Sequence, residues 1–245
     1  MNENVVRSLS GIVYIFLLIF ATLFSRESFL FLFGLFLLQT VREFSTLIQL
    51  PKLTSVLVSL VLYLLFGVFF SNQFSTDVGL LLVSVLVCSQ LLLWLFSNTS
   101  RPMITITEKW VKLIGYIILP FVFMTKIPMI NNQFIPSIII GIFILIWTND
   151  TFAYLVGKSI GKHKLFERIS PKKTIEGFVG GLIFAIIAAF LLSESTIFGS
   201  FFSSLYWIPI AIIVSVFGTI GDLIGSKFKR KAGVKDSGAI MPGHG

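Results

Sequence analysis

Eight stretches of mostly apolar residues follow one another along the chain, separated by short polar connections. Each is close to the ~20 residues that an α-helix needs to cross the hydrocarbon core of a bilayer. We therefore expect an all-α, polytopic membrane protein with about eight transmembrane helices. The expected spans are 9–24, 28–47, 53–70, 78–97, 110–126, 134–157, 175–193 and 205–226.

The boundary between the first two spans is the weakest part of this map, because only residues 25–28 separate them. A cleavable signal peptide is the alternative interpretation of the first span. The segment Ala21-Thr22-Leu23 is a poor match to the small-residue cleavage site that such a peptide needs. We therefore favour a retained membrane helix.

The distribution of positive charge gives the map an orientation. All of the 19 Lys and Arg residues except Arg26 and Lys126 fall on one side of an eight-span arrangement. Lys and Arg collect in cytoplasmic loops, so we expect both termini and the basic loops in the cytoplasm. We expect residues 1–130 to form membrane scaffold helices and residues 131–245 to form a catalytic half with cytoplasmic loops 157–174 and 227–245.

Composition supports the membrane assignment. Hydrophobic residues make up 56% of the chain and charged residues only 12%, with a mean hydropathy of +0.96, which excludes an ordinary soluble domain.

The single cysteine, Cys88, cannot form an intramolecular disulfide and is expected to be a small buried hydrophobe. His163 and His244 lie in separate polar segments, so a zinc site of Cys/His type has almost no support.

Two acidic residues lie near the cytoplasmic ends of separate spans. Asp150 precedes the end of the sixth span by about seven residues, on the order of 10 Å at ~1.5 Å per residue. Asp222 lies at a similar depth in the eighth span. A charge near the bilayer centre costs roughly 2.5–3.5 kcal/mol on insertion scales. Asn149 and Thr151 add oxygen atoms beside Asp150. A buried ion pair or interface hydrogen bond is the alternative to a functional site.

The loop Gly157–Thr174 is rich in lysine and has glycines at 157 and 161. This pattern suggests anion binding through backbone amides and charge, with contact to anionic lipid headgroups as the alternative. It does not match a Walker A loop, since Val156 precedes Gly161 by five and His163 replaces Ser or Thr.

The end of this loop is expected to begin a helix, with Ser170 or Thr174 as its N-cap and Pro171 in its first turn. Lys172 and Lys173 would then lie at a positive helix end, where a phosphate is favoured.

Glycines mark both of the last two spans. Gly177 and Gly181 form a small-xxx-small pair, which predicts close helix packing. Gly218, Gly221 and Asp222 share one broad face of the eighth span, and this face also carries Gly225. Packing is one interpretation of that face. In the other, Asp222 holds a metal, and the same face continues to Ser226, Lys229 and Arg230, which bind phosphate.

The carboxyl end resembles the signature of the CDP-diacylglycerol synthases (phosphatidate cytidylyltransferases). The matching residues are Ser226, Phe228, Lys229, Arg230, Lys235, Asp236, Gly238, Pro242, His244 and Gly245, with Met241 in place of the usual Leu, Ile or Phe. The stretches 149–150 and 170–177 are similar to the family's second conserved region. The sequence ends at Gly245, before the family's next glycine and its Asp-Arg-hydrophobic-Asp segment, and we therefore expect a truncated copy or fragment. The activity of the 245-residue chain itself then depends on whether those aspartates are dispensable.

The resemblance implies transfer of a cytidylyl group from CTP to phosphatidate in phospholipid biosynthesis, with Mg²⁺ and optionally a second cation as cofactor. Asp222 would be a metal ligand, Asp150 a ligand or a lysine partner, and Lys173 and Lys229 would complete the catalytic set. The substrate-binding side chains would be those of Lys172, Ser226, Arg230, Lys235, Asp236 and His244. The expected partners are CTP, phosphatidate and the lipid bilayer of a bacterial plasma membrane, with the site facing the cytoplasm. The family also implies a homodimer, and we expect no nucleic-acid partner.

Two other functions compete with this interpretation. A CTP-dependent lipid kinase would share the basic loops and acids but would phosphorylate a lipid alcohol. A transporter would place polar residues near the bilayer midplane on broken helices, whereas the informative polar residues here collect near one membrane face.

Overall fold

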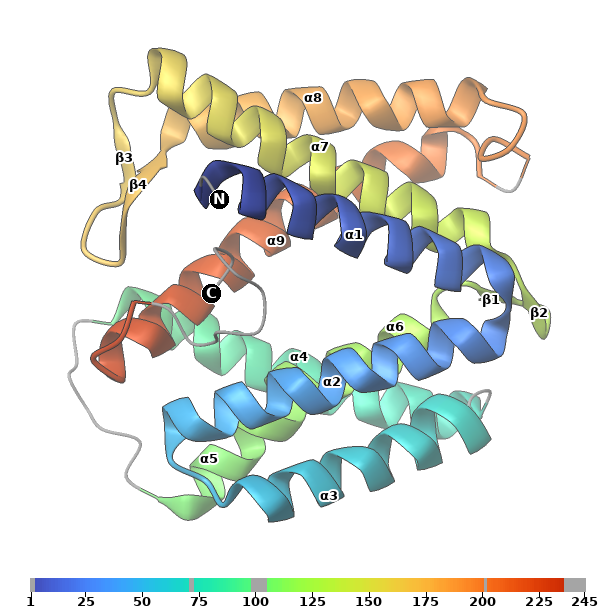
Figure 1. Ribbon diagram of the computed structural model, residues 1–245, viewed down its shortest axis with the longest axis vertical. Helices are drawn as coiled ribbons and strands as arrows, with labels where there is room; N and C mark the ends of the chain where they lie inside the picture. Colours follow the sequence, from blue (N-terminus) through green and yellow to red (C-terminus); the bar gives the residue numbers. More distant parts are fainter. Residues whose placement is uncertain (1–2, 71–72, 98–104, 201, 236–245) are drawn as a thin grey trace. The chain divides into compact units, whose positions relative to one another are not determined.

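The computed structural model describes residues 3–70, 73–97, 105–200 and 202–235. These residues form a predominantly α-helical membrane fold with two small β-hairpins (Figure 1). The helices are α1 (Glu3–Phe24), α2 (Arg26–Ile48), α3 (Lys52–Leu62), η1 (Tyr63–Phe69), α4 (Phe74–Phe96), α5 (Ile106–Lys112), η2 (Leu113–Ile118), α6 (Leu119–Lys126), α7 (Pro136–Ile160), α8 (Ile175–Glu194) and α9 (Ser204–Lys231). The strands are β1 (Met129–Ile130), β2 (Gln133–Phe134), β3 (Lys164–Phe166) and β4 (Ser170–Thr174), and each hairpin is antiparallel.

Each expected span lies largely on helix, although the span 134–157 begins at Phe134 in strand β2. Within the described residues, six helical segments are long and apolar enough to cross a membrane: Arg26–Ile48, Lys52–Phe69, Phe74–Phe96, Pro136–Ile160, Ile175–Glu194 and Ser204–Lys231. The apolar part of α1, Ser10–Phe24, is shorter, and the expected span 110–126 is divided among α5, the π-helix η2 and α6. The number of spans and the side of the membrane that holds the termini stay predictions.

The chain divides into two compact units, one formed by 1–134 with 228–245 and the other by 135–227. In the first unit, Phe29, Leu37 and Val41 of α2 are fully buried. The hydroxyl of Tyr63 in η1 donates to the carbonyl of Leu30 at 2.9 Å, and its ring lies against Gly34. This partly buried side-chain hydrogen bond ties η1 to α2 where lipid offers no alternative partner.

The break between α1 and α2 is a single residue, Ser25. Its hydroxyl accepts from the backbone amide of Ser28 at 3.1 Å, while the Ser28 hydroxyl contacts the Ser25 amide at 3.0 Å, forming a capping box. The Ser28 hydroxyl also donates to the carbonyl of Ala21 at 2.6 Å. The two serines therefore satisfy backbone groups that the break would leave without partners.

The last residues of α9 belong to the first unit. Phe228 is 2% exposed, and its ring centroid lies 5.0 Å from that of Phe44, 4.8 Å from that of Trp94 and 5.8 Å from that of Tyr116. Phe228 occupies the hydrophobic position of the carboxyl-terminal signature. That position is therefore filled by a core residue.

The second unit is built on α7 and α8, which pack side by side (Figure 1). Small residues make this packing close: a Cβ added to Gly180 would lie 2.7 Å from a methyl carbon of Val156. The Gly177–Gly181 pair packs in the way its spacing predicts.

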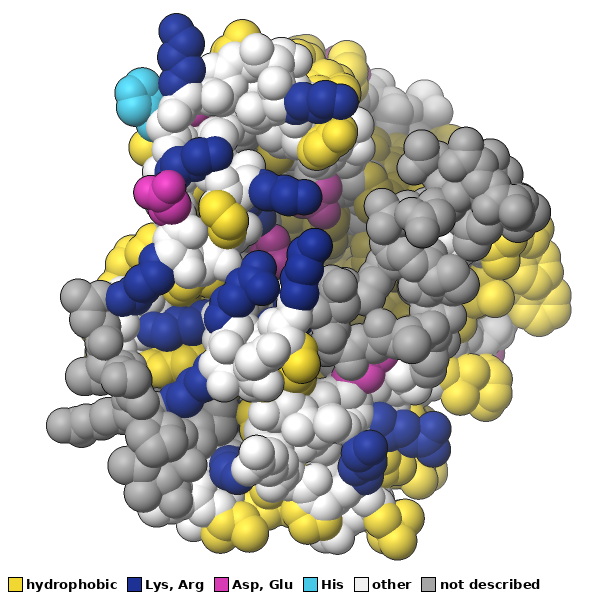
Figure 2. All heavy atoms as spheres, turned by 60° about the vertical axis from the view of Figure 1, so that its left-hand side comes forward, with side chains coloured by type: hydrophobic (Ala, Val, Ile, Leu, Met, Phe, Trp, Pro, Cys, Tyr) yellow, Lys and Arg dark blue, Asp and Glu magenta, His cyan; other side chains and the backbone are white. Residues whose placement is uncertain are grey.

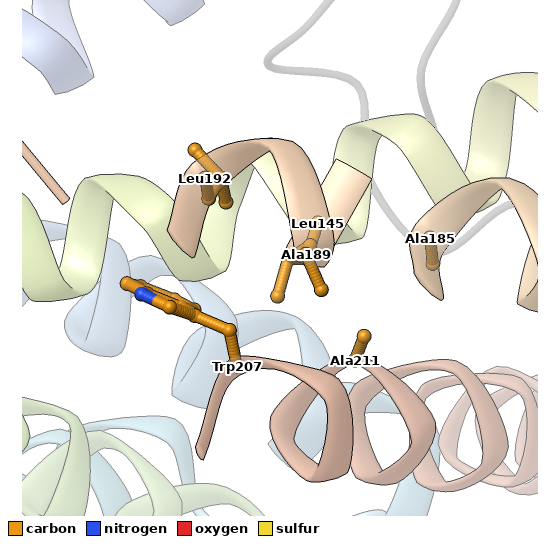
Figure 3. Close-up of a cluster of buried hydrophobic side chains, with 6 residues drawn as sticks. All are labelled: Leu145, Ala185, Ala189, Leu192, Trp207 and Ala211. Carbon is orange, nitrogen blue, oxygen red and sulfur yellow. The ribbon is translucent and has the colours of Figure 1, made fainter. Parts of the chain in front are cut away.

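The first part of α9 packs against α7 and α8 around Trp207, which is 1% exposed. Figure 3 shows Trp207 and Ala211 of α9 beside Leu145 of α7 and beside Ala189 and other α8 residues. The Trp207 ring occupies the space that a side chain at Gly141 would need, and its indole N–H donates to the carbonyl of Phe198 at 3.3 Å.

Candidate active site

Helix α7 places Asn149 and Asp150 on neighbouring parts of its surface. Asn149 is 6% exposed, and its amide nitrogen donates to a carboxylate oxygen of Asp150 at 3.2 Å. The amide oxygen Oδ1 lies against α8, since a Cβ added to Gly181 would come within 2.9 Å of it. Gly181 thus leaves room for Asn149, and Asn149 in turn orients Asp150.

The segment between α7 and α8 folds as the β3–β4 hairpin and is fastened at its base by Glu176. The Glu176 carboxylate accepts from the backbone amides of Lys162 at 3.1 Å and His163 at 3.2 Å, and it contacts Nδ1 of His163 at 2.6 Å. The amide of Ile175 also donates to the carbonyl of His163 at 2.9 Å. These contacts fix the hairpin to the start of α8.

The expectation that backbone amides of the glycine-rich loop bind an external anion is wrong for the amides at 161–163. The amide of Gly161 donates to the carbonyl of Gly157 at 3.2 Å, and the amides of Lys162 and His163 already hold the Glu176 carboxylate. The loop does have the geometry of an anion-binding turn. Its anion is a side chain of the same chain, which lies 14 residues further on from Lys162.

The helix expected to begin near Ser170 begins instead after Thr174. The Thr174 hydroxyl accepts from the amide of Gly177 at 3.1 Å and is the N-cap of α8, so one of the two expected caps is confirmed. Ser170 and Pro171 belong to strand β4, and placing Pro171 in a first helical turn was wrong. Lys172 and Lys173 therefore lie on a strand that leads into the helix.

Lys173 and Asp222 join the hairpin to α9. The Lys173 ammonium lies 2.5 Å from a carboxylate oxygen of Asp222, with side chains 31% and 58% exposed. Asp150 interacts electrostatically with both Lys173 and Asp222. Two acids from separate helices and one lysine from the hairpin therefore share one charged cluster, as the matching depths of the acids predict.

This cluster lies in the wall of a cavity of about 1030 Å³ within the second unit. The lining combines carboxylates, lysines and apolar side chains: Ile146, Asn149, Asp150, Ala153, Tyr154, Gly157, Lys158, Lys164, Leu165, Pro171, Lys172, Lys173, Thr174, Gly177, Phe178, Val214, Gly218, Thr219 and Asp222. Figure 2 brings the β3–β4 side forward and shows Lys and Arg side chains around acidic ones there.

The structure brings some of the candidate residues together and leaves others apart. Asp150, Asp222, Lys172 and Lys173 all line the cavity. Ser226 lies one turn beyond Asp222 on α9 and is not among the lining residues. Three further candidates belong to the first unit, namely Lys229, Arg230 and Lys235. Asp236 and His244 lie outside the described residues.

Sequence reasoning missed several residues of the site. Lys158 and Lys164 line the cavity, and the signal for them was their place in the basic loop that leads from α7 to α8. Glu176 falls within the stretch 170–177, and nothing in that pattern alone assigns it a role. Its position in the first turn of α8, beside the Thr174 cap, was the available signal for a carboxylate that binds backbone amides.

The carboxylates suit a hard divalent cation. Among the described residues, no cluster of three or more His, Cys, Asp and Glu side chains could form an all-protein metal cage. Mg²⁺ is typically held by one or two carboxylates together with substrate phosphates. Asp150 and Asp222 in one cavity meet that requirement.

Comparison with known proteins shows two kinds of likeness. The sequence profile of the Cytidylyltransferase family matches residues 5–245. A protein of Staphylococcus saprophyticus named phosphatidate cytidylyltransferase is 52% identical over 104 residues, which is 42% of this chain and 39% of that protein. Proteins of the same name from Staphylococcus haemolyticus and Staphylococcus aureus are 50% identical over 105 residues, with the same shares. The aligned segment thus spans well under half the length of these relatives.

Proposed function

Because the chain belongs to the cytidylyltransferase family, we propose that it transfers a cytidylyl group from CTP to phosphatidate, giving CDP-diacylglycerol and pyrophosphate for phospholipid biosynthesis. The relatives' shared name, phosphatidate cytidylyltransferase, supports this choice of substrates. The reaction would take place in a bacterial plasma membrane with the site facing the cytoplasm.

The observation that carries the proposal is the cluster of Asp150, Lys173 and Asp222 in a cavity whose wall also holds Lys158, Lys164 and Lys172. Two polyanions must meet in this reaction, and their mutual repulsion is the main obstacle. Catalysis of such transfers rests on positioning and on neutralisation of charge. A site with four lysines and two carboxylates supplies both.

The chemistry asks little of a general base. The second pKa of a phosphate monoester is about 6, so the phosphatidate headgroup is already a nucleophile at neutral pH. One of its phosphate oxygens attacks the α-phosphorus of CTP, the bond from that phosphorus to the oxygen that bridges to the β-phosphate breaks, and pyrophosphate leaves with the electron pair. Lys172 and Lys173 would bind oxygens of the reacting phosphates, where negative charge shifts from the attacking oxygen to the leaving pyrophosphate.

Asp150 and Asp222 would hold Mg²⁺, which, when bound, would neutralise phosphate charge. Asn149 keeps the Asp150 carboxylate oriented through its 3.2 Å hydrogen bond. Lys173 balances the charge of Asp222 at 2.5 Å and, as a cation that lines the cavity, would also bind a substrate phosphate.

The test uses CTP that carries one label on the cytosine and another on the γ-phosphate. Membranes that contain the 245-residue chain are incubated with phosphatidate, and the extracted lipid is counted for both labels. A parallel sample uses the chain extended by the family's Asp-Arg-hydrophobic-Asp segment.

Cytidine on the lipid with release of labelled pyrophosphate is the expected result in at least one of the two samples. γ-Phosphate on the lipid without cytidine would identify a lipid kinase instead. Lipid without either label in both samples would overturn the proposal, and uptake of substrate into vesicles without CTP turnover would then favour a transporter.

A further inference from the structure

The glycines of the second unit fall into two groups that differ in what surrounds them. A Cβ added to Gly177 would lie 2.6 Å from the carbonyl oxygen of Ala153, and one added to Gly181 would lie 2.7 Å from that of Asn149. Packing of α8 on α7 requires glycine at both positions. At Gly218 and Gly221 of α9, an added Cβ would meet no atom of the described residues within 4 Å, so close packing against those residues does not explain either glycine.

Gly218 differs from Gly221 because it lines the cavity. Val214, Gly218 and Asp222 recur at four-residue intervals on α9 and all face the cavity, as residues at helical spacing do. Opposite them, α7 contributes Ile146 on the apolar side of Asp150. The free space at Gly218 is therefore space inside the site.

The cavity wall changes character along α9. At Asp222 it is charged, because Asp222 pairs there with Lys173, which also lines the cavity. Val214 lies eight residues away, roughly 12 Å along the helix at ~1.5 Å per residue, and there the wall is apolar. On the flanks of this stretch, Ile213 and Phe217 are 55% and 63% exposed, as expected of side chains that face lipid.

A wall that is charged at one end and apolar at the other fits an amphiphile whose phosphate lies at the charged end. We propose that the Val214–Gly218 wall receives the glycerol and acyl part of a phosphate-bearing lipid, and that Gly218 determines the specificity for it by leaving the space the acyl chains need. This inference rests on the proposed function for the identity of the lipid. The polar ribose, base and triphosphate of CTP gain nothing from an apolar wall.

The test compares Gly218→Leu with Gly221→Leu. Both glycines lie on α9, and at each an added Cβ would meet no atom of the described part of the chain within 4 Å, but of the two only Gly218 lines the cavity. Gly221 is also adjacent to Asp222, so its variant reports on any indirect disturbance of the acid. Gly218→Ala serves as a milder change in case the leucine variant folds poorly, and thermal unfolding in detergent checks each variant.

Gly218→Leu is expected to raise KM for dioleoyl phosphatidate about tenfold, since overpacking costs about 1–3 kcal/mol and ~1.4 kcal/mol is a factor of ten. KM for dihexanoyl phosphatidate should rise less, and KM for CTP should stay unchanged. Gly218→Ala should shift the long-chain lipid in the same direction by a smaller factor, and Gly221→Leu should change neither KM.

Binding of radiolabelled dioleoyl phosphatidate in detergent micelles is measured alongside turnover. The unsubstituted chain could bind this lipid without transferring cytidine, with the binding lost only in Gly218→Leu. That result would overturn the proposed function but support the lipid-binding role of the Val214–Gly218 wall. An equal effect of Gly218→Leu on CTP and lipid, an equal effect of the two leucine variants, or no binding of the lipid by the unsubstituted chain would overturn the inference.

Discussion

Helix α8 and helix α9 both carry glycines near acids or lysines of the candidate site, but they use them in opposite ways. In α8, glycine brings two backbones together, because a Cβ added to Gly177, Gly180 or Gly181 would collide with atoms of α7. In α9, glycine leaves space open, and the helix meets the hairpin through the Lys173–Asp222 ion pair. Glycine at similar helical spacing therefore permits close helix packing in α8 and leaves space in the cavity beside α9.

The largest loss of stability is expected for Gly181→Leu, which tests whether the glycines of α8 are needed for close packing. Its side chain would collide with the backbone and side-chain oxygens of Asn149 at 2.7 and 2.9 Å, so the free energy of unfolding should fall by about 3 kcal/mol or more. Thermal unfolding in detergent, followed by circular dichroism, measures the loss. Gly221→Leu is the matched control and should leave stability within ~0.5 kcal/mol; equal losses in both variants would remove the distinction between the helices.

A second experiment compares two ion pairs of similar geometry. Asp222→Asn removes a carboxylate of the site and should lower cytidylyl transfer about 100-fold, the scale seen when one preorganised electrostatic group is lost. Because the Asp222 side chain is 58% exposed, its stability cost should stay under ~1 kcal/mol.

Asp77→Asn breaks the Lys126–Asp77 pair of the first unit, whose charged atoms are also 2.5 Å apart, and should leave transfer unchanged. The two variants are compared by the initial rate of lipid labelling at saturating CTP. Similar rates in both would contradict a catalytic role for Asp222.

The smallest effect is expected for Glu176→Gln, which tests whether the hairpin must be fastened to α8. The neutral amide would bind the amides of Lys162 and His163 less strongly, so the hairpin should loosen and kcat/KM should fall severalfold. Hydrogen exchange at those two amides should speed up. Glu167→Gln, an exposed change in the same hairpin, is the control, and unchanged exchange in Glu176→Gln would rule out the fastening role.

Much of the helical architecture could be predicted from the sequence, because runs of apolar residues near 20 long have few other solutions in a membrane. The meeting of Asp150 and Asp222 was predictable for a related reason. Each residue of a membrane helix advances ~1.5 Å along the helix axis, so the position of a residue in its span gives its depth in the membrane. Asp150 and Asp222 have similar depths in their spans, so both lie near the same membrane face.

The β3–β4 hairpin could not be predicted in this way. Its strands have three and five residues, too short for a periodic pattern, and its anchor joins Lys162 to a carboxylate 14 residues away. The space beside Gly218 could not be predicted either. The spacing of glycines along a helix does not show whether a neighbouring helix packs against them. Both depend on contacts between distant residues, which local pattern does not encode.

The single-residue connection between α1 and α2 bears on how the protein enters the membrane. With only Ser25 between the helices and its capping box closed onto Ser28 and Ala21, the polar turn has its hydrogen bonds already made. The apolar part of α1 is shorter than the ~20 residues that cross a bilayer on their own. The two helices are therefore suited to enter the bilayer together as one helical hairpin during synthesis, and a cleavage after residue 24 would destroy the unit that inserts.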